Sequence, residues 1–361
     1  MSTTSPGGGR RTRSSAAAAA FTAEPTNPEA TAPDSRADIS IRPATGDDVP
    51  GVLELARIAL GWTGGDDEAR TFAWKHLENP FGASPMWVAV VDDRVVGFRA
   101  FMRWEFLRGE GRIVLAARAV DTATAPDYEG RGIFTRLTLA ALPELAAGGV
   151  ELVFNTPNQR SLPGYLKMGW RVVGRLSVAV TPTRPGSLVA MATARRPASR
   201  RSIEMHVGEP AVDVFADVAA IERLQSSRST VPGLATRRTP AFLQWRYGNQ
   251  ALQYRVARAG SSLDEGLVVF RLRRRGAALE AVVCDVLTPG FDRLLAYELV
   301  RRVARLTRAD YLIRLDRRLV SRHRAVRLPR AGPVLTCRTL GGEPAPGLRE
   351  WRLTMGDIEL F

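Results

Sequence analysis

Residues 121–137, which read DTATAPDYEGRGIFTRL, decide the fold because they join the end of a strand to the start of a helix. Pro126 follows the strand, and Gly130 and Gly132 lie directly before the helix. Glycines there let the backbone approach a ligand closely, and the first turn of a helix presents unpaired N–H groups to an anion. The stretch therefore predicts a cradle for a pyrophosphate group, although two glycines before a helix also occur in ordinary turns.

A second motif, NTPNQRSLPGYLKMGW at residues 155–170, supplies a side chain that can donate a proton. Around Tyr165 it places further residues at set spacings: Asn158, Ser161, Lys167, Gly169 and Trp170. The Tyr165 hydroxyl is either a proton donor beside a reacting centre or a buried group with an ordinary hydrogen bond. The first motif favours the catalytic interpretation of the second.

The hydrophobic pattern around both motifs predicts strands and helices in the order β-α-α-β-β-β-α-β-α-β. The expected strands are 39–42, 86–91, 94–106, 111–124, 150–155 and 170–180. The expected helices are 45–60, 66–78, 130–149 and 158–168. The first part of the chain is therefore predicted to be an α/β domain.

The same series of elements begins again near residue 240, which indicates an internal repeat. TFAWKHLENP at 71–80 reappears as AFLQWRYGNQ at 241–250, and the matched residues are Phe72 and Phe242, Trp74 and Trp245, Lys75 and Arg246, and His76 and Tyr247. Strands at 252–259, 266–274, 278–287 and 310–315 and a helix at 291–306 follow. We therefore expect two copies of one α/β unit, at 38–183 and 201–361. The linker at 184–200 is rich in Pro, Ser and Arg, and the tail at 1–37 is too poor in large apolar residues to be ordered.

Composition limits the classes of protein to which the chain can belong. A length of 361 residues predicts two domains, and a hydrophobic fraction of 45% with 24% charged residues excludes global disorder. No run of 18 apolar residues is present, so we expect no membrane span. Two cysteines outside any CxxC pair indicate a reducing cytoplasm, and the scattered residues His76, His206 and His323 lack the spacing of metal ligands.

The positive charge lies in the second half of the chain. Residues 184–361 carry 31 basic and 17 acidic side chains, and the whole chain has a net charge of +14. Such a surface can hold acidic ligands or an RNA backbone, or it can simply be solvated. Stretches such as LRRRG and RRVARLTR show little of the aromatic interleaving expected for base stacking, which disfavours nucleic acid as a partner.

Together the two motifs and the order of elements resemble the GNAT superfamily of N-acetyltransferases over residues 38–180. The phosphate loop of that family is written Q/R-x-x-G-x-G/A, and EGRGIF at 129–134 aligns with it. Glu129 replaces the usual Arg or Gln, and Phe134 replaces the final small residue. The later family pattern N-x-x-S-x-x-x-Y-x-K-x-G-aromatic fits Asn158 to Trp170 fully.

The resemblance implies an α/β fold of two GNAT-like units, each a mixed, mostly antiparallel sheet flanked by helices. It also implies acetyl-CoA as co-substrate without a metal. The backbone of the strand before the loop would bind the pantetheine arm, and N–H groups of the loop and helix would bind the pyrophosphate. The implied acyl-CoA residues are Thr122, Ala123, Thr124, Gly130, Arg131, Gly132, Ile133, Phe134, Thr135 and Asn158.

The second half resembles a degenerate GNAT unit. Thr288-Pro289-Gly290 stands where its phosphate loop should be, with one glycine and a proline that lacks an N–H, so we expect no acyl-CoA there. Tandem proteins with one working half include mycothiol synthases and the mycobacterial enhanced-intracellular-survival aminoglycoside acetyltransferases. In the latter, the tyrosine that corresponds to Tyr165 is the general acid and the C-terminal carboxylate is the base.

The resemblance implies transfer of an acetyl or related acyl group from the thioester to an amine, with Tyr165 protonating the departing sulfur. Carboxylates that could serve as the base are Glu105, Glu110, Asp121, Asp357, Glu359 and the terminal carboxylate of Phe361. Terminal carboxylates are commonly solvated, but WRLTMGDIELF ends the chain with an amphipathic, aromatic-anchored pattern. We expect a small-molecule amine as acceptor. The alternatives are an inactive GNAT scaffold that binds or regulates, favoured by Glu129, and an RNA-linked acyl or aminoacyl transferase.

Overall fold

The computed structural model describes residues 38–60, 66–184, 186–187, 197–227, 231–315, 325–328 and 330–359. The predicted disordered tail at 1–37 and most of the predicted linker at 184–200 lie outside these residues. Within the described ranges, no helix is both long and apolar enough to cross a bilayer.

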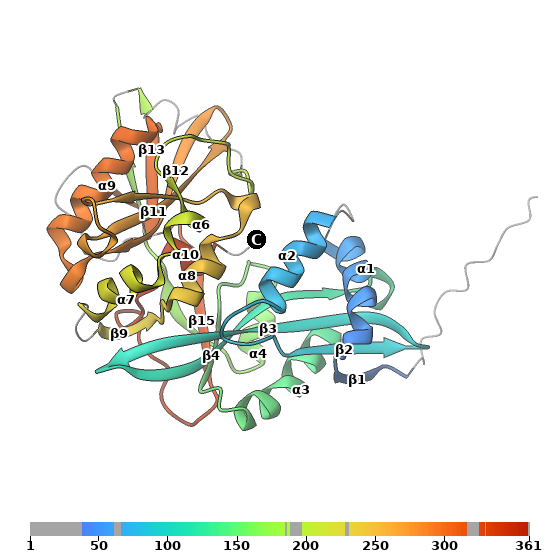
Figure 1. Cartoon of the computed structure of the whole chain (residues 1–361). Helices are drawn as coiled ribbons and strands as arrows, with labels where there is room; N and C mark the ends of the chain where they lie inside the picture. Colours follow the sequence, from blue (N-terminus) through green and yellow to red (C-terminus); the bar gives the residue numbers. More distant parts are fainter. Residues whose placement is uncertain are drawn as a thin grey trace, which may run out of the picture. The chain divides into compact units, whose positions relative to one another are not determined.

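The first sheet contains the elements predicted from the first half of the chain (Figure 1). Its strands follow the order β1 (Ser40–Pro43), β2 (Met86–Val91), β3 (Arg94–Gly109), β4 (Arg112–Thr124), β5 (Leu152–Asn155), β15 (Val334–Thr339) and β6 (Arg171–Arg175), and β9 (Val231–Thr236) also pairs with β3. Among the described strands of this sheet, only β4 and β5 pair in parallel. Figure 1 shows α1 (Val49–Leu60) and α2 (Asp66–His76) on one face and α3 (Ile133–Ala147) on the other. The short helix α4 (Leu162–Lys167) precedes β6.

The second sheet follows the same plan. Its order is β8 (Glu209–Pro210), β10 (Arg255–Arg258), β11 (Leu267–Arg275), β12 (Ala278–Leu287), β13 (Tyr311–Leu315), β7 (Val178–Pro182) and β14 (Val326–Leu328), with only β12 and β13 parallel. The helices of this half are α6 (Ala211–Val214), α7 (Val218–Ser226), α8 (Pro240–Tyr247), α9 (Arg293–Thr307) and α10 (Met355–Ile358). The predicted fold class, two mostly antiparallel sheets flanked by helices, is confirmed.

Each sheet receives strands from the other half of the chain: β7 joins the second sheet, and β15 and β9 join the first. β7 follows β6 in the sequence but pairs with β13 and β14 in the second sheet. In return, β15 follows β14 and inserts between β5 and β6 in the first sheet. The prediction of one strand over 170–180 is therefore wrong, because the chain leaves the first sheet between Arg175 and Val178. Alternation of apolar residues reveals a strand but not the sheet that it joins.

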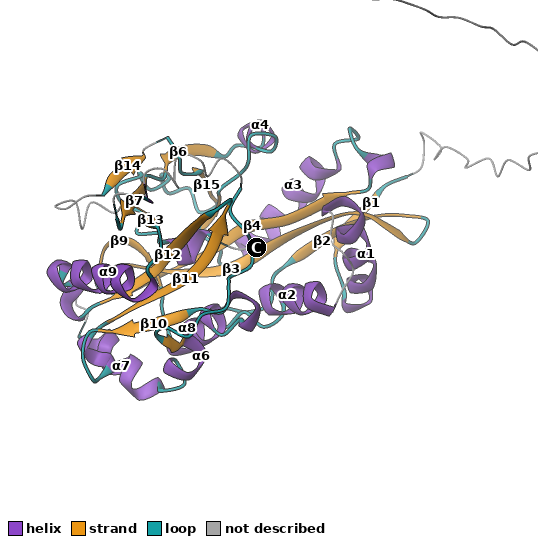
Figure 2. Cartoon of the chain, turned by 90° about the horizontal axis from the view of Figure 1, so that it is seen from above, coloured by secondary structure: helices purple, strands orange, loops and turns teal. Residues whose placement is uncertain are grey.

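The two halves share one hydrophobic core. The face of the second sheet that carries Phe270 and Val283 packs against α9, whereas residues of the opposite face, such as Val269 and Cys284, belong to the same buried cluster as Trp104. Figure 2 shows α9 and α8 on opposite sides of the second sheet. Burial of this large apolar cluster between the sheets stabilises the two halves together.

One pair of the residues matched as repeats, Trp74 and Trp245, meets within this core. The rings of Trp74 and Trp245 stack with centroids 5.0 Å apart. Each indole Nε1 donates a hydrogen bond of 2.7 Å to the main-chain oxygen of the other tryptophan. Two buried indoles thus satisfy their N–H groups reciprocally, as buried tryptophans require.

The strand exchange predicts that residues 1–183 do not fold alone. Without residues 184–361, β6 loses β15, its only partner in the described part of the chain, and Trp104 loses the ring of Phe242. We expect the isolated fragment to show no cooperative thermal transition, measured by circular dichroism. Addition of separately produced 184–361 should restore one. Cooperative melting of 1–183 alone would contradict the prediction, since independent domains melt independently.

Candidate active site

The turn before α3 is built by two glycines in the left-handed region. Gly130 has a φ of +76° and Gly132 a φ of +72°, a conformation that costs other residues energy. Gly132 is the N-cap of α3. A β-carbon built on either glycine would meet no atom within 4 Å, so the space in front of the helix is open. Free N–H groups at the start of α3 therefore face a region that an anion can enter.

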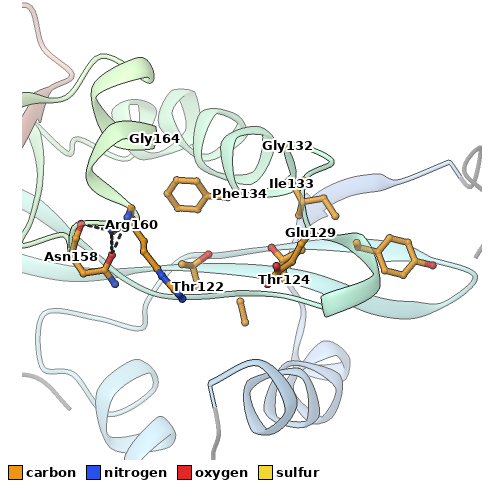
Figure 3. A pocket seen from close by; sticks show the side chains of 13 residues that line it. Thr122, Thr124, Glu129, Gly132, Ile133, Phe134, Asn158, Arg160 and Gly164 are labelled. Carbon is orange, nitrogen blue, oxygen red and sulfur yellow. Dashed lines mark hydrogen bonds between the residues drawn. The ribbon is translucent and has the colours of Figure 1, made fainter.

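A cavity of about 550 Å³ occupies this region (Figure 3). It is bordered by the end of β4, the turn, the first residues of α3 and the segment before α4; its lining residues are Thr122, Ala123, Thr124, Tyr128, Glu129, Gly130, Gly132, Ile133, Phe134, Asn158, Arg160, Ser161 and Gly164. Most of the residues implied to bind acyl-CoA thus come together around one space. Arg131 and Thr135 are not among them, because Arg131 lies over the ring of Tyr128 at 4.8 Å and Thr135 is exposed on α3.

The end of β4 is separated from its neighbour β5 beside this cavity. β4 pairs with β5 only from Ala116 to Arg118, so the backbone of Thr122–Thr124 borders the cavity instead of another strand on that side. A β-bulge lies between these stretches. Arg99 pairs with Thr122 and Ala100 with Val120, which leaves Asp121 as the extra residue, with a φ of +32°. Bulges of this kind re-aim backbone groups next to functional sites.

Tyr165, the predicted proton donor, is not among the residues that line the cavity but contacts one of them, Phe134. Its side chain is buried, and its ring meets Phe134 edge-on with centroids 5.4 Å apart. Its hydroxyl accepts a hydrogen bond from Nη2 of Arg99, a residue that the sequence prediction missed. The missed signal was a single arginine within the otherwise apolar strand sequence VVGFRAFM at 95–102.

Asp121, a predicted base, is already paired. Its Oδ2 lies 2.9 Å from Nζ of Lys75 and 2.8 Å from Nε2 of His76, and Nδ1 of His76 lies 3.0 Å from the Ser84 hydroxyl. Burial raises the pKa of Asp121, but the positive charge of Lys75 and the hydrogen bond to His76 outweigh burial and hold the pKa well below its usual range. Burial also lowers the pKa of His76. A carboxylate held ionised in this way is a weak base.

None of the other predicted bases that the structure describes lines the cavity, and three of them, Glu105, Asp357 and Glu359, are in ion pairs. Glu105 is bound by Arg237 at 2.6 Å and stands six residues along β3 from Arg99, about 20 Å away at 3.3 Å per residue. Glu110 is exposed at the turn between β3 and β4. Asp357 and Glu359 are bound by arginines of the second half, and the Phe361 carboxylate lies outside the described residues.

The C-terminal segment is nevertheless not a solvated tail. Trp351, Leu353 and Met355 are buried in the shared core. Arg118 of β4 donates hydrogen bonds to the main-chain oxygens of Asp357 and Ile358, the latter at 2.9 Å. Residues 351–359, the described part of WRLTMGDIELF, thus form a docked segment that connects the second half to β4.

At the equivalent place in the second half, a side-chain carboxylate caps the helix, although Gly290 of the turn also has a positive φ, +55°, and open surroundings. Pro289–Phe291 form a 3₁₀ turn before α9. The carboxylate of Asp292 accepts hydrogen bonds from the N–H groups of Leu294 and Leu295, at 2.8 and 3.1 Å. These are the helix N–H groups that an anion would need, and a carboxylate repels phosphate.

No cluster of histidine, cysteine and acidic side chains suited to a metal occurs within the described residues. Both cysteines, Cys284 and Cys337, are buried and unpaired by disulfide, and burial raises the pKa of each thiol to about 12. Buried thiols of this kind are inert packing groups.

Residues 40–173 match the family model described as an acetyltransferase (GNAT) domain. A sequence search of curated proteins finds no match. The fold resembles a GCN5-related N-acetyltransferase from Anabaena variabilis, with 17% identity and a TM-score of 0.58 over 84% of this chain and 73% of that one. A GCN5-related N-acetyltransferase from Kribbella flavida matches with 16% identity and a TM-score of 0.55 over 83% and 71%.

Eis1 from Mycobacterium abscessus is similar to the same extent, with 15% identity and a TM-score of 0.54 over 84% of this chain and 74% of that one. The matched 84% of this chain is more than either half contains, so the similarity in fold extends over both sheets. Residues 40–173 of this chain form an acetyltransferase domain of the GNAT family.

Proposed function

We propose that the protein transfers an acyl group from acetyl-CoA or a related acyl-CoA to a small-molecule amine. The observation that carries the proposal is the open cavity in front of α3, bordered by two left-handed glycines and by the uncovered end of β4. Within a GNAT domain, such a space fits the pyrophosphate and pantetheine parts of an acyl-CoA.

Different backbone groups around the cavity bind the pyrophosphate and the pantetheine arm of the acyl-CoA. N–H groups from Gly130 to Thr135 hold the pyrophosphate, helped by the positive end of the α3 dipole. The backbone of Thr122–Thr124 pairs with the pantetheine amides as a neighbouring strand would. In the second half, Asp292 caps the corresponding helix, so one acyl-CoA binds per chain.

Arg160 compensates for the unfavourable charge of Glu129 in this cradle. Glu129 lines the cavity where the family pattern has Arg or Gln. Arg160 lines the opposite side, and its side chain extends over the cavity toward Thr122 (Figure 3). A guanidinium there provides the cation that phosphate oxygens need.

The reaction is a direct aminolysis of the thioester. The amine nitrogen attacks the carbonyl carbon, and an N–H at the β4 bulge stabilises the resulting oxyanion. The C–S bond then breaks, the sulfur takes its electron pair, and Tyr165 gives it a proton. Glu105, Asp357 and Glu359 are bound to arginines and Asp121 is paired with Lys75, so the proton of the amine passes to water.

Replacing Arg160 by glutamine is expected to weaken acetyl-CoA binding about tenfold, because one charged hydrogen bond to phosphate is lost. Isothermal titration calorimetry gives the dissociation constant. Arg131→Gln is the matched control, since Arg131 is not among the residues that line the cavity and its guanidinium lies over the ring of Tyr128. Its effect on the dissociation constant should stay within about twofold. Equal losses in both variants would show that net charge alone matters.

The proposal is tested by measuring thiol release from acetyl-CoA with the purified protein across a panel of amines. Amine-dependent release that is absent from Tyr165→Phe supports transfer. Saturable acetyl-CoA binding without thiol release in the presence of any amine would favour the alternative function, an inactive GNAT scaffold that binds or regulates. Glu129 is the residue that favours this alternative. Absence of acetyl-CoA binding would overturn both interpretations.

A further inference from the structure

Arg99 is a buried cation beside the cavity. It lies in the middle of β3 with 1% of its surface exposed. Its guanidinium carbon lies 5.1 Å from the ring centre of Phe101 and 5.4 Å from those of Phe134 and Tyr165. Aromatic rings on several sides thus surround the charge.

Within the described part of the chain, no carboxylate forms an ion pair with Arg99, and its Nε has no hydrogen-bond partner. Arg238 of the other half differs, since it is held by Asp285 and Asp357, and buried Arg246 has three hydrogen-bond acceptors, the Tyr254 hydroxyl and the main-chain oxygens of Gly356 and Glu359. Taking a guanidinium out of water without a counter-ion is strongly unfavourable, and ring quadrupoles offset only part of the cost. A buried cation without a counter-ion is expected at a site where negative charge develops during the reaction.

The one side-chain hydrogen bond that Arg99 makes within the described residues determines how Tyr165 can use its proton. Nη2 of Arg99 donates to the Tyr165 oxygen, so the hydroxyl acts as acceptor toward Arg99. A guanidinium cannot accept a hydrogen bond, and the hydroxyl proton must therefore point elsewhere. Because Phe134 contacts the Tyr165 ring and also lines the cavity, the ring of Tyr165 is one side chain away from the acyl-CoA space.

We propose that Arg99 is the positioning residue of the proton donor: it directs the Tyr165 proton toward the sulfur and stabilises the phenolate that proton transfer leaves behind. As the C–S bond breaks, its electron pair goes to sulfur, the O–H bond of Tyr165 breaks and an S–H bond forms. The phenolate, held by the Arg99 guanidinium, regains a proton from solvent after the products leave. This inference rests on the proposed acyl transfer.

The test is a double-mutant cycle with Arg99→Gln, Tyr165→Phe and the double variant, in acyl transfer to one active amine. Arg99→Gln alone is expected to lower kcat about 10–100-fold while the dissociation constant of acetyl-CoA changes less than about threefold. In the Tyr165→Phe background, Arg99→Gln should lower kcat less than about twofold, because a residue that acts only through Tyr165 has nothing left to act on. Arg99→Lys keeps the charge and should recover at least about half of the lost kcat on a logarithmic scale.

Thermal melting of each variant separates this role from packing. If Arg99→Gln lowers kcat equally in both backgrounds, or if Arg99→Lys is as slow as Arg99→Gln, the inference is overturned although the proposed function stands. If Arg99→Gln fails to fold, the cycle is run with Arg99→Lys, whose effect on kcat must vanish in the Tyr165→Phe background. Absence of transfer by the unmodified protein overturns the proposed function, and this inference with it.

Discussion

Tyr165→Phe is expected to lower kcat by about 10²–10⁴-fold while the acetyl-CoA dissociation constant stays nearly unchanged. The variant keeps the ring, and with it the edge-on contacts with Phe134 and Trp170, and removes only the hydroxyl. The hydroxyl acts when thiolate charge develops, so its loss affects the transition state and not ground-state binding. Steady-state kinetics and calorimetric titration on one preparation measure both quantities.

A purely structural role for Tyr165 gives the opposite pattern. The variant would lose the hydrogen bond from Arg99, at a cost of about 1–3 kcal/mol in the free energy of unfolding, while turnover stays normal. Thermal melting reports that loss directly. Normal kcat in Tyr165→Phe would remove the residue from the mechanism.

Gly132→Val is expected to weaken acetyl-CoA binding by about 100-fold or more, equivalent to nearly 3 kcal/mol. A β-branched residue at a φ of +72° is strained, so the turn must change and the N–H groups at the start of α3 lose their alignment. Its side chain also projects into the open space that the phosphates need. Titration with acetyl-CoA measures the effect.

Gly342→Val is the matched control for Gly132→Val. Gly342 has a φ of +78° and equally open surroundings but lies outside the cavity lining. It should show similar strain in a thermal melt with normal acetyl-CoA binding. Tight binding in Gly132→Val, or titration of two sites per chain in the unmodified protein, would show that the pyrophosphate site is wrongly assigned.

The glycine turn and the elements around it could be predicted because their causes are local. Gly130 and Gly132 stand next to a helix with a clear 3.6-residue period, and both lie at positive φ. The strands at 86–91 and 111–124 are long enough for the apolar pattern to define them.

The features that could not be predicted from the sequence depend on contacts between residues that are far apart in the chain. The pairing of Glu105 with Arg237 joins positions 132 apart, and Arg238 meets Asp357 across 119 positions. These ion pairs decide which carboxylates remain available as bases, and no spacing rule reveals them. Arg99 escaped notice for the same reason, because its partner Tyr165 is 66 residues away.

Because β15 lies near the end of the chain, the first sheet cannot be completed until most of the chain has been translated. β5 pairs with β15 between Asn155 and Thr336, which are 181 residues apart. At about 5–20 residues per second, the ribosome needs roughly 10–40 s to make that interval. During this time β5 and β6 have been translated, but β15, which pairs with both, has not. An open sheet edge of that kind is a site for wrong pairing. Correct pairing in the first sheet therefore depends on keeping this edge free of other strands until β15 has been made.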